Sequence, residues 1–319
     1  MRISTSLIFN SGTSGIQNLQ SGLYRLQNQL STGRRILAPE DDPIGASEAL
    51  QVGQSKAVNT QFLDNQANAG NKLGFLDSTL SGIQDELLAI KDRAIQAGNS
   101  SYSPEQRAMI AQELKQRMAS LIGYGNTQDG EGNYIFSGYK TSTQPFQVNA
   151  GGTQPYALGN QTYVSYSGDA GKQALQVTAS QQMSTSENGL DVFMQVRDAQ
   201  GNVTGRSLFD SLQNMIDILD PSSGQPYNST MYSQSLADMS SAIDHVSTVR
   251  ARVGANMQAL GSLTTNAQDI GFLYDTRLSD LQDLDYTAAI SQFTQTQTQL
   301  QAAQLSFKQT SQLSLFNIL

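Results

Sequence analysis

The chain has 319 residues, which is long enough to bury a substantial core and suggests more than one domain. Its net charge of -8 and pI near 4.6 exclude a general nucleic-acid-binding role, because no basic stripe can displace phosphate counterions. There is no cysteine, so the sequence offers neither a disulfide framework nor a thiolate metal site.

Residues 1–14 contain only a short apolar patch, Leu7 to Phe9, whereas a signal peptide needs a core of about 7 to 15 apolar residues. No segment approaches the roughly 20 apolar residues of a membrane helix, and an acidic chain is not attracted to anionic membranes. We therefore expect no membrane partner. If the protein leaves the cell, we expect export without a cleaved signal peptide.

The first periodic segment predicts a helix over residues 16–30. Its apolar residues recur at spacings of three and four and share one helical face: Ile16, Leu19, Leu23, Leu26 and Leu30. Gly33 ends this pattern. Asp42 followed by Pro43 predicts an N-cap with proline at the first position of a second helix.

The longest apolar seam predicts that this second helix continues to residue 97. It keeps alternating spacings of four and three through Ala69, Leu73, Leu76, Leu80, Ile83, Leu87, Ile90, Ala94 and Ala97. Gly98 and Asn99 indicate its end. Ser103 and Gln106 predict a capping box for a third helix, which places Ile110, Leu114, Arg117 and Leu121 on one face.

The period changes to two after Gly123, which predicts a β-rich domain inserted at residues 140–202. The short apolar runs separated by turn residues lie at 134–136, 146–148, 163–166, 175–177 and 192–194. Helical spacing then returns over residues 207–219.

A long helix is expected after the turn-forming run 221–226, as the partner of the seam at 69–97. Its heptad residues are Leu236, Met239, Ile243, Val246, Arg250, Val253, Met257, Leu260, Thr264, Ala267 and Tyr274. A weaker seam follows at Ala289, Phe293, Thr296, Leu300, Ala303, Phe307 and Thr310. The sequence closes on Leu313, Leu315, Phe316, Ile318 and Leu319.

These patterns predict a mainly α fold with an inserted β domain, in which the N- and C-terminal helices pair as a coiled coil or helical bundle. The expected domains are 1–42 with 285–319 for assembly, 43–139 with 203–284 as a helical bundle, and 140–202 as the β insertion. The terminal seams are rich in Gln, Thr and Ala, so their pairing is weak without neighbours. An ordinary intramolecular bundle is the alternative.

Catalytic and metal sites find little support in the residues. The single histidine, His245, lies beside an apolar helix face and has no second histidine to form a relay or metal triad. Asp41 and Asp42 are explained by helix capping. Asp129 and Glu131 alternate with glycine but lack the spacing of a calcium loop. We expect no enzyme activity, cofactor or metal.

Residues 30–46, which read Leu-Ser-Thr-Gly-Arg-Arg-Ile-Leu-Ala-Pro-Glu-Asp-Asp-Pro-Ile-Gly-Ala, resemble the N-terminal signature of bacterial flagellins and their hook-associated relatives. Residues 284–288 resemble the paired C-terminal signature. The resemblance implies a flagellar subunit whose terminal helices form an assembly interface. On this basis the candidate interface residues are Leu19, Leu23, Leu26, Leu30, Arg34, Arg35, Phe293, Leu300 and Phe307.

The segment 133–139 with Pro145 and Phe146 is similar to members of this superfamily that join the hook to the filament. The resemblance implies a homo-oligomeric ring that contacts the first hook-associated junction protein and flagellin. It also implies an export chaperone, with Leu313, Leu315, Phe316, Ile318 and Leu319 as its candidate site, and an extracellular location. The alternatives are a flagellin filament subunit, a secreted adhesin or type III tip protein that binds through residues 140–200, and an enzyme.

Overall fold

The computed structural model of the chain describes residues 2–99, 101–149, 156, 162–197 and 200–316. Its helices are α1 (Arg2–Thr32), α2 (Pro43–Ala97), α3 (Pro104–Gly125), α4 (Leu208–Leu219), α5 (Ser229–Gln282) and α6 (Tyr286–Phe316). Short strands are β1 (Phe146–Val148), β2 (Val164–Tyr166), β3 (Ala174–Gln176) and β4 (Gln182–Ser184). A π-helix spans Leu190–Met194 and a 3-10 turn spans Pro221–Ser223. The predicted mainly α fold is confirmed.

The chain forms two compact units, which are described separately. The terminal unit consists of Met1–Thr60 and Gln268–Leu319, and the bundle unit consists of Gln61–Ala267. These boundaries differ from the predicted domain ends because α2 and α5 each contribute residues to both units.

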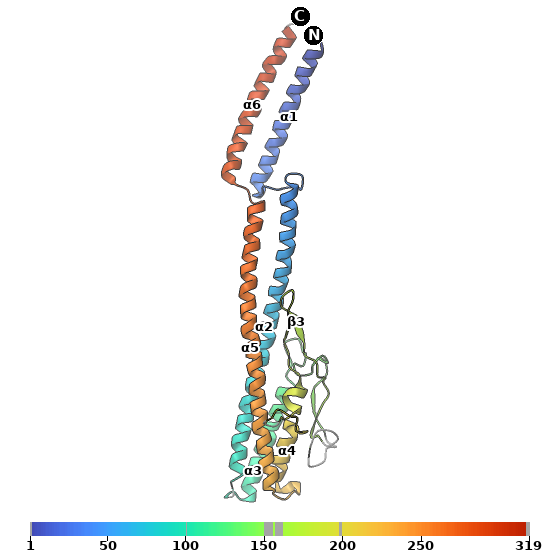
Figure 1. Cartoon of the computed structure of the whole chain (residues 1–319), viewed down its shortest axis with the longest axis vertical. Helices are drawn as coiled ribbons and strands as arrows, with labels where there is room; N and C mark the ends of the chain where they lie inside the picture. The colour runs from blue at the N-terminus through green and yellow to red at the C-terminus, as the bar shows by residue number, and fades with distance from the viewer. Residues whose placement is uncertain (1, 100, 150–155, 157–161, 198–199, 317–319) are drawn as a thin grey trace. The chain divides into compact units, whose positions relative to one another are not determined.

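In the bundle unit, α2 and α5 lie side by side, as predicted (Figure 1). Every residue of the α2 seam from Ala69 to Ala97 is at most 3% exposed. The α5 face opposite is formed by Met239, Ala242, Val246, Val249 and Val253. The prediction was wrong for Met257, which is exposed, and Val249, which was not predicted, is buried on the same helix.

Helices α3 and α4 pack beside this pair and begin at the expected residues. The hydroxyl of Ser103 accepts a hydrogen bond from the amide of Gln106, and the Gln106 side chain accepts one from the Ser103 amide at 2.9 Å. Ser207 and Asp210 form the same capping box on α4. The predicted cap of α3 is therefore confirmed.

The predicted β-rich domain is not formed. The described residues between 140 and 202 contain two antiparallel two-stranded sheets, with Phe146 opposite Tyr166 in β1–β2 and Leu175 opposite Met183 in β3–β4. Such hairpins are marginal alone, and their apolar side chains are buried in the helical core. The insertion is therefore part of the bundle unit.

Two of the expected strands, at 134–136 and 192–194, do not form, because their aromatic side chains also pack into the core. Residues 190–194 form a π-helix, and residues 134–136 make only an isolated bridge, between Tyr134 and Gln128. Phe136 and Phe193 leave this irregular backbone to fill an aromatic cluster, with ring centroids 5.3 Å apart. A run of three apolar residues does not distinguish such packing from a strand. The strand β4 was not predicted.

Candidate assembly site

In the terminal unit, α1 and α6 form an antiparallel pair, as Figure 1 shows. Leu26, near the end of α1, and Ala289, in the first turn of α6, are buried. Six other candidate interface residues are only half-buried: Leu19, Leu23, Leu30, Phe293, Leu300 and Phe307. Thr310, the last residue of the predicted α6 seam, is exposed. Two helices therefore leave this seam open to further partners.

An aromatic contact joins the first part of α1 to the last part of α6. The rings of Phe9 and Phe307 lie with centroids 5.1 Å apart. A Cβ atom added to Gly12 would come within 2.7 Å of the Phe307 ring, so glycine at this position lets the ring lie directly on the α1 backbone. The close approach of α1 and α6 here depends on Gly12.

Large apolar side chains also lie on the outer faces of the pair. Leu7 and Tyr24 on α1, and Ile290 and Leu305 on α6, are all more than half exposed. Exposed apolar residues of this kind gather where a protein meets a partner. The described part of the α1–α6 pair therefore combines an incomplete seam with apolar outer faces.

A non-helical joint connects these helices to the adjoining ends of α2 and α5. Gly33 ends α1 with a φ of 70°, and a Cβ atom there would lie 2.8 Å from the Tyr286 hydroxyl. Its carbonyl accepts a hydrogen bond from the amide of Leu284 at 2.9 Å. The two motifs that resemble flagellin signatures, far apart in the sequence, meet here.

Arg35 fastens the joint from several sides. Its amide donates to the Gln282 carbonyl at 2.7 Å, and its guanidinium donates to the Leu281 carbonyl at 2.8 Å and to the Asp42 carboxylate at 3.1 Å. Asp42 also caps α2 by accepting from the Gly45 amide, and this hydrogen bond, with that of Arg35, lowers the Asp42 pKa. The arginine and carboxylate of the motif therefore have structural partners within the chain.

The neighbouring Arg34 behaves differently. Its backbone makes an isolated bridge with Asp283, but its side chain is exposed and its guanidinium has no acid partner among the described residues. The C-terminal candidates are placed only in part. Leu313, Leu315 and Phe316 lie in the last turns of α6, whereas Ile318 and Leu319 lie outside the described residues.

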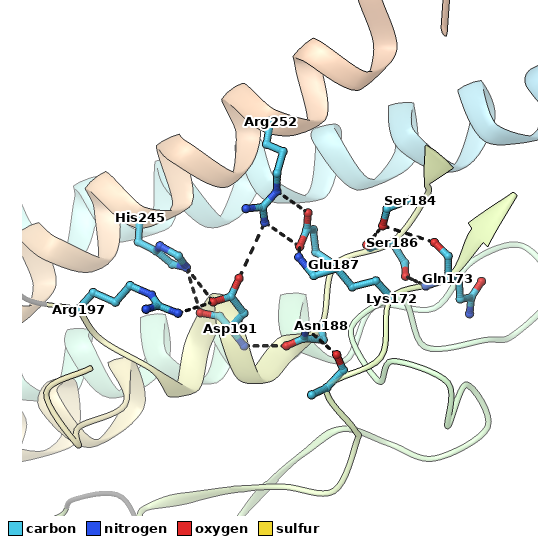
Figure 2. Close-up of polar contacts among 11 residues, drawn as sticks. Lys172, Gln173, Ser184, Ser186, Glu187, Asn188, Asp191, Arg197, His245 and Arg252 are labelled. Atoms are coloured by element: carbon cyan, nitrogen blue, oxygen red, sulfur yellow. Dashed lines mark hydrogen bonds and ion pairs between the residues drawn. The ribbon is translucent and has the colours of Figure 1, made fainter. Parts of the chain in front are cut away.

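His245 belongs to a polar cluster of the bundle unit that Figure 2 shows. Its Nε2 atom lies 3.0 Å from the Asp191 carbonyl, and burial lowers its pKa despite the nearby Asp191 carboxylate. Arg252 donates to Glu187 at 3.0 Å, and Arg197 donates to Asp191 at 3.0 Å. These contacts hold residues 187–197 against α5. Sequence reasoning placed His245 on the helix but missed its partners.

The remaining acidic candidates also have structural roles. The Asp129 carboxylate accepts hydrogen bonds from the amides of Glu131 and Asn133, both at 2.9 Å, which closes the predicted turn. In the part of the chain that is described, no three His, Asp or Glu side chains are grouped so that they could hold a metal ion. No described helix is long and apolar enough to cross a lipid bilayer.

Comparison with known proteins agrees with this architecture. Residues 3–141 match the bacterial flagellin N-terminal helical region, and residues 236–319 match the bacterial flagellin C-terminal helical region. Flagellar hook-associated protein 3 of Escherichia coli K12 is 30% identical over all of this chain and 99% of its own length.

Solved structures share the fold. A flagellar hook-associated protein of Vibrio parahaemolyticus has a TM-score of 0.66 at 19% identity, covering 76% of this chain and 100% of that one. Flagellar hook-associated protein 3 of Legionella pneumophila has a TM-score of 0.62 at 21% identity, covering 72% and 98%. The predicted superfamily is confirmed. The chain belongs to the flagellar hook-associated protein 3 family, the hook-filament junction branch of the bacterial flagellins.

Proposed function

We propose that copies of this chain form a ring that joins the hook, through the first hook-associated junction protein, to the flagellin filament. The α1–α6 pair carries the proposal. Its seam is half-buried and its outer faces expose Leu7, Tyr24, Ile290 and Leu305. Fully burying a leucine side chain contributes about 1.5 to 3 kcal/mol of stabilising free energy. A half-exposed leucine gains the remaining part of this free energy when a neighbouring chain covers it.

In the ring, terminal helices of adjacent copies cover the open sides of each α1–α6 pair. Leu19, Leu23, Phe293 and Phe307 then reach the burial that their own chain does not supply. The joint that Arg35 fastens fixes where α1 and α6 leave α2 and α5. The role is mechanical, and the relatives of the chain are structural flagellar proteins.

Export precedes assembly in this proposal. The chain passes through the flagellar type III apparatus without a cleaved signal peptide and becomes part of the external flagellum. Leu313, Leu315, Phe316, Ile318 and Leu319 form the chaperone site before export, and their apolar pattern is the support for this step. The same residues are free for assembly once the chaperone is released.

The packing of the described residues between 140 and 202 bears on the adhesin alternative. Phe146, Val164 and Val177 are buried in the bundle core and are not available to a separate binding domain. A filament subunit is the remaining alternative, and the full-length similarity to hook-associated protein 3 favours the junction.

A deletion strain tests the proposal. We expect cells without this chain to keep their hooks, lose their filaments and shed flagellin into the medium, and we expect the intact gene to restore attached filaments. Electron microscopy of the cells and immunoblots of the medium provide the measurement. A strain that keeps normal filaments would contradict the junction role. Hooks with no flagellin secreted would instead indicate a defect in export.

A further inference from the structure

An open groove of about 560 Å³ lies within the terminal unit, between the joint and the adjoining ends of α2 and α5. Its lining is mainly apolar and includes Leu37, Ala49, Leu50, Gly53 and Leu278. Leu50 is largely exposed although it lines the groove. The surface thus has the size and apolar character to receive two large side chains.

Arg34 stands at the rim of this groove. Other cations nearby are paired, since Lys56 contacts Asp275 and Arg277 contacts Glu48. Arg34 has no acid partner among the described residues. The groove therefore presents an apolar floor beside one unpaired positive charge, which fits a ligand that is apolar with one acid at its edge.

A surface with these properties is present on α5 of the same unit. Phe272 is 72% exposed and Leu273 is 64% exposed, and both are fixed on a regular helix. Asp269, at three and four residues before them, shares their face. Its exposed carboxylate has no partner among the described residues. We call these three residues the ridge.

The ridge cannot fill the groove of its own chain. Leu278, on the same helix, lines the groove. At 3.6 residues per turn, the ridge residues lie roughly 120° to 220° around α5 from Leu278, on the opposite side of the helix. A patch and a complementary pocket that face opposite ways give a head-to-tail contact between copies, which closes into a ring or continues as a helix.

We propose that the ridge of one copy docks in the groove of the next copy, with Asp269 paired to Arg34. Phe272 and Leu273 enter the apolar groove beside Leu50. This contact rests on the proposed ring and identifies surfaces that build it. Unpaired charges of opposite sign on the two surfaces also favour this register over others.

Disulfide trapping tests the contact directly, because the chain has no cysteine of its own. Gly53 has open space around its Cα, so Gly53→Cys is tolerated sterically. A double variant, Gly53→Cys with Leu273→Cys, is expressed in the deletion strain, and isolated flagella are treated with a mild oxidant. We expect a ladder of covalent multimers of this chain. Each single variant should give no ladder.

Charge exchange provides the second measurement. Arg34→Glu and Asp269→Arg should each lower the amount of this chain in isolated flagella several-fold, and the double exchange should restore it. Asp244→Arg is the matched control, because Asp244 is an exposed acid on the same helix within the bundle unit. Circular dichroism of each purified variant checks that the helices are retained.

The outcomes separate this inference from the proposed function. A ladder together with rescue by the double exchange supports the contact. Flagella that contain the double-cysteine variant without a ladder, or with cross-links only to another flagellar protein, overturn it and leave the junction role intact. Failure of the junction role appears earlier, as a deletion strain that keeps its filaments.

Discussion

The two long helix pairs of this protein use the same heptad spacing but end at different degrees of burial. Along α2, the seam from Ala69 to Ala97 is closed by α5 and its neighbours. Among the residues of α1 and α6 whose burial is described, only Leu26 and Ala289 are buried, and most other seam residues are half-buried. One pair completes its core within the chain, whereas the other leaves its seam partly uncovered in the single chain.

The difference follows from what covers each pair. Helices α3 and α4, the hairpins and the π-helix add Leu114, Phe209, Phe146 and Phe193 to the α2–α5 core. The α1–α6 pair has no such cover among the described residues. Marginal seams of this kind gain their stability from tertiary or quaternary packing more than from helix propensity. Substitutions should therefore act on unfolding in one unit and on assembly in the other.

Leu87→Ala should give the largest effect on unfolding. Leu87 is fully buried in the α2 seam, and a Leu→Ala change in such a site costs about 2 to 5 kcal/mol because a cavity remains. Urea denaturation of the free protein, followed by circular dichroism, measures the change. Leu88→Ala is the control, since Leu88 is 43% exposed and should lose less than about 1 kcal/mol. Equal losses would break the comparison.

Asp217 should make the bundle unit sensitive to pH. Burial raises the pKa of Asp217 to about 6, only partly opposed by the hydrogen bond from Gln213. The folded state therefore binds more protons than the unfolded state between about pH 4 and 6, and stability falls as pH rises through this window. Asp217→Asn should remove the fall and stabilise the protein at pH 7.5 by at most about 3 kcal/mol.

Denaturation of parent and Asp217→Asn at pH 4.5 and 7.5 checks this. We expect the difference in free energy of unfolding between the two proteins to grow toward pH 7.5. If this difference were the same at both pH values, the Asp217 carboxyl would have the same pKa in the folded and unfolded states. Asp244→Asn, at an exposed site on α5, should change neither value measurably.

Ser103→Ala should cost about 1 kcal/mol, because it removes the capping box of α3 in the bundle unit. Ser120→Ala, which alters an exposed hydroxyl on the same helix, should cost less. Asp42 caps α2 in the terminal unit, so Asp42→Ala should leave the main transition of the bundle unit unchanged. A shift of that transition by Asp42→Ala would mean that the two units unfold together.

Most helices and several of their ends could be predicted because their signals are local and repeated. The start of α1 at Arg2 was missed, since the predicted helix began with the apolar seam at Ile16. The stop at Gly33, the cap at Asp42 and the capping box at Ser103 each rest on a few adjacent residues. The seams of α1 and α6 were predictable for the same reason, since their spacing alone selects Leu26, which is buried, and Phe307, which contacts α1.

Three short strands were predicted near their observed positions, at 146–148, 163–166 and 175–177. Their packing into the helical core and the contacts of the joint could not be predicted, because those contacts are distant in sequence. Phe193 reads as part of a strand, yet it stacks on Phe209, with ring centroids 5.6 Å apart, from a π-helix. The contact of Arg35 with Leu281 links positions far apart in the chain. The unpaired charge of Arg34 also becomes visible only when the partners of Arg35, Lys56 and Arg277 are known.

Leu23→Ala should have the smallest effect on unfolding and a clear effect on assembly. Leu23 is half-buried on the α1 seam, so its truncation should cost the free protein less than about 1 kcal/mol. In flagella the same side chain would be covered by neighbours, and its loss should lower incorporation of the chain. Urea denaturation and the amount of chain in isolated flagella measure the two effects. Leu87→Ala should instead have its larger effect on the unfolding of the free protein and its smaller effect on assembly. If Leu23→Ala destabilised the free chain as much as Leu87→Ala, the α1–α6 pair would be a finished core and the difference between the two pairs would disappear.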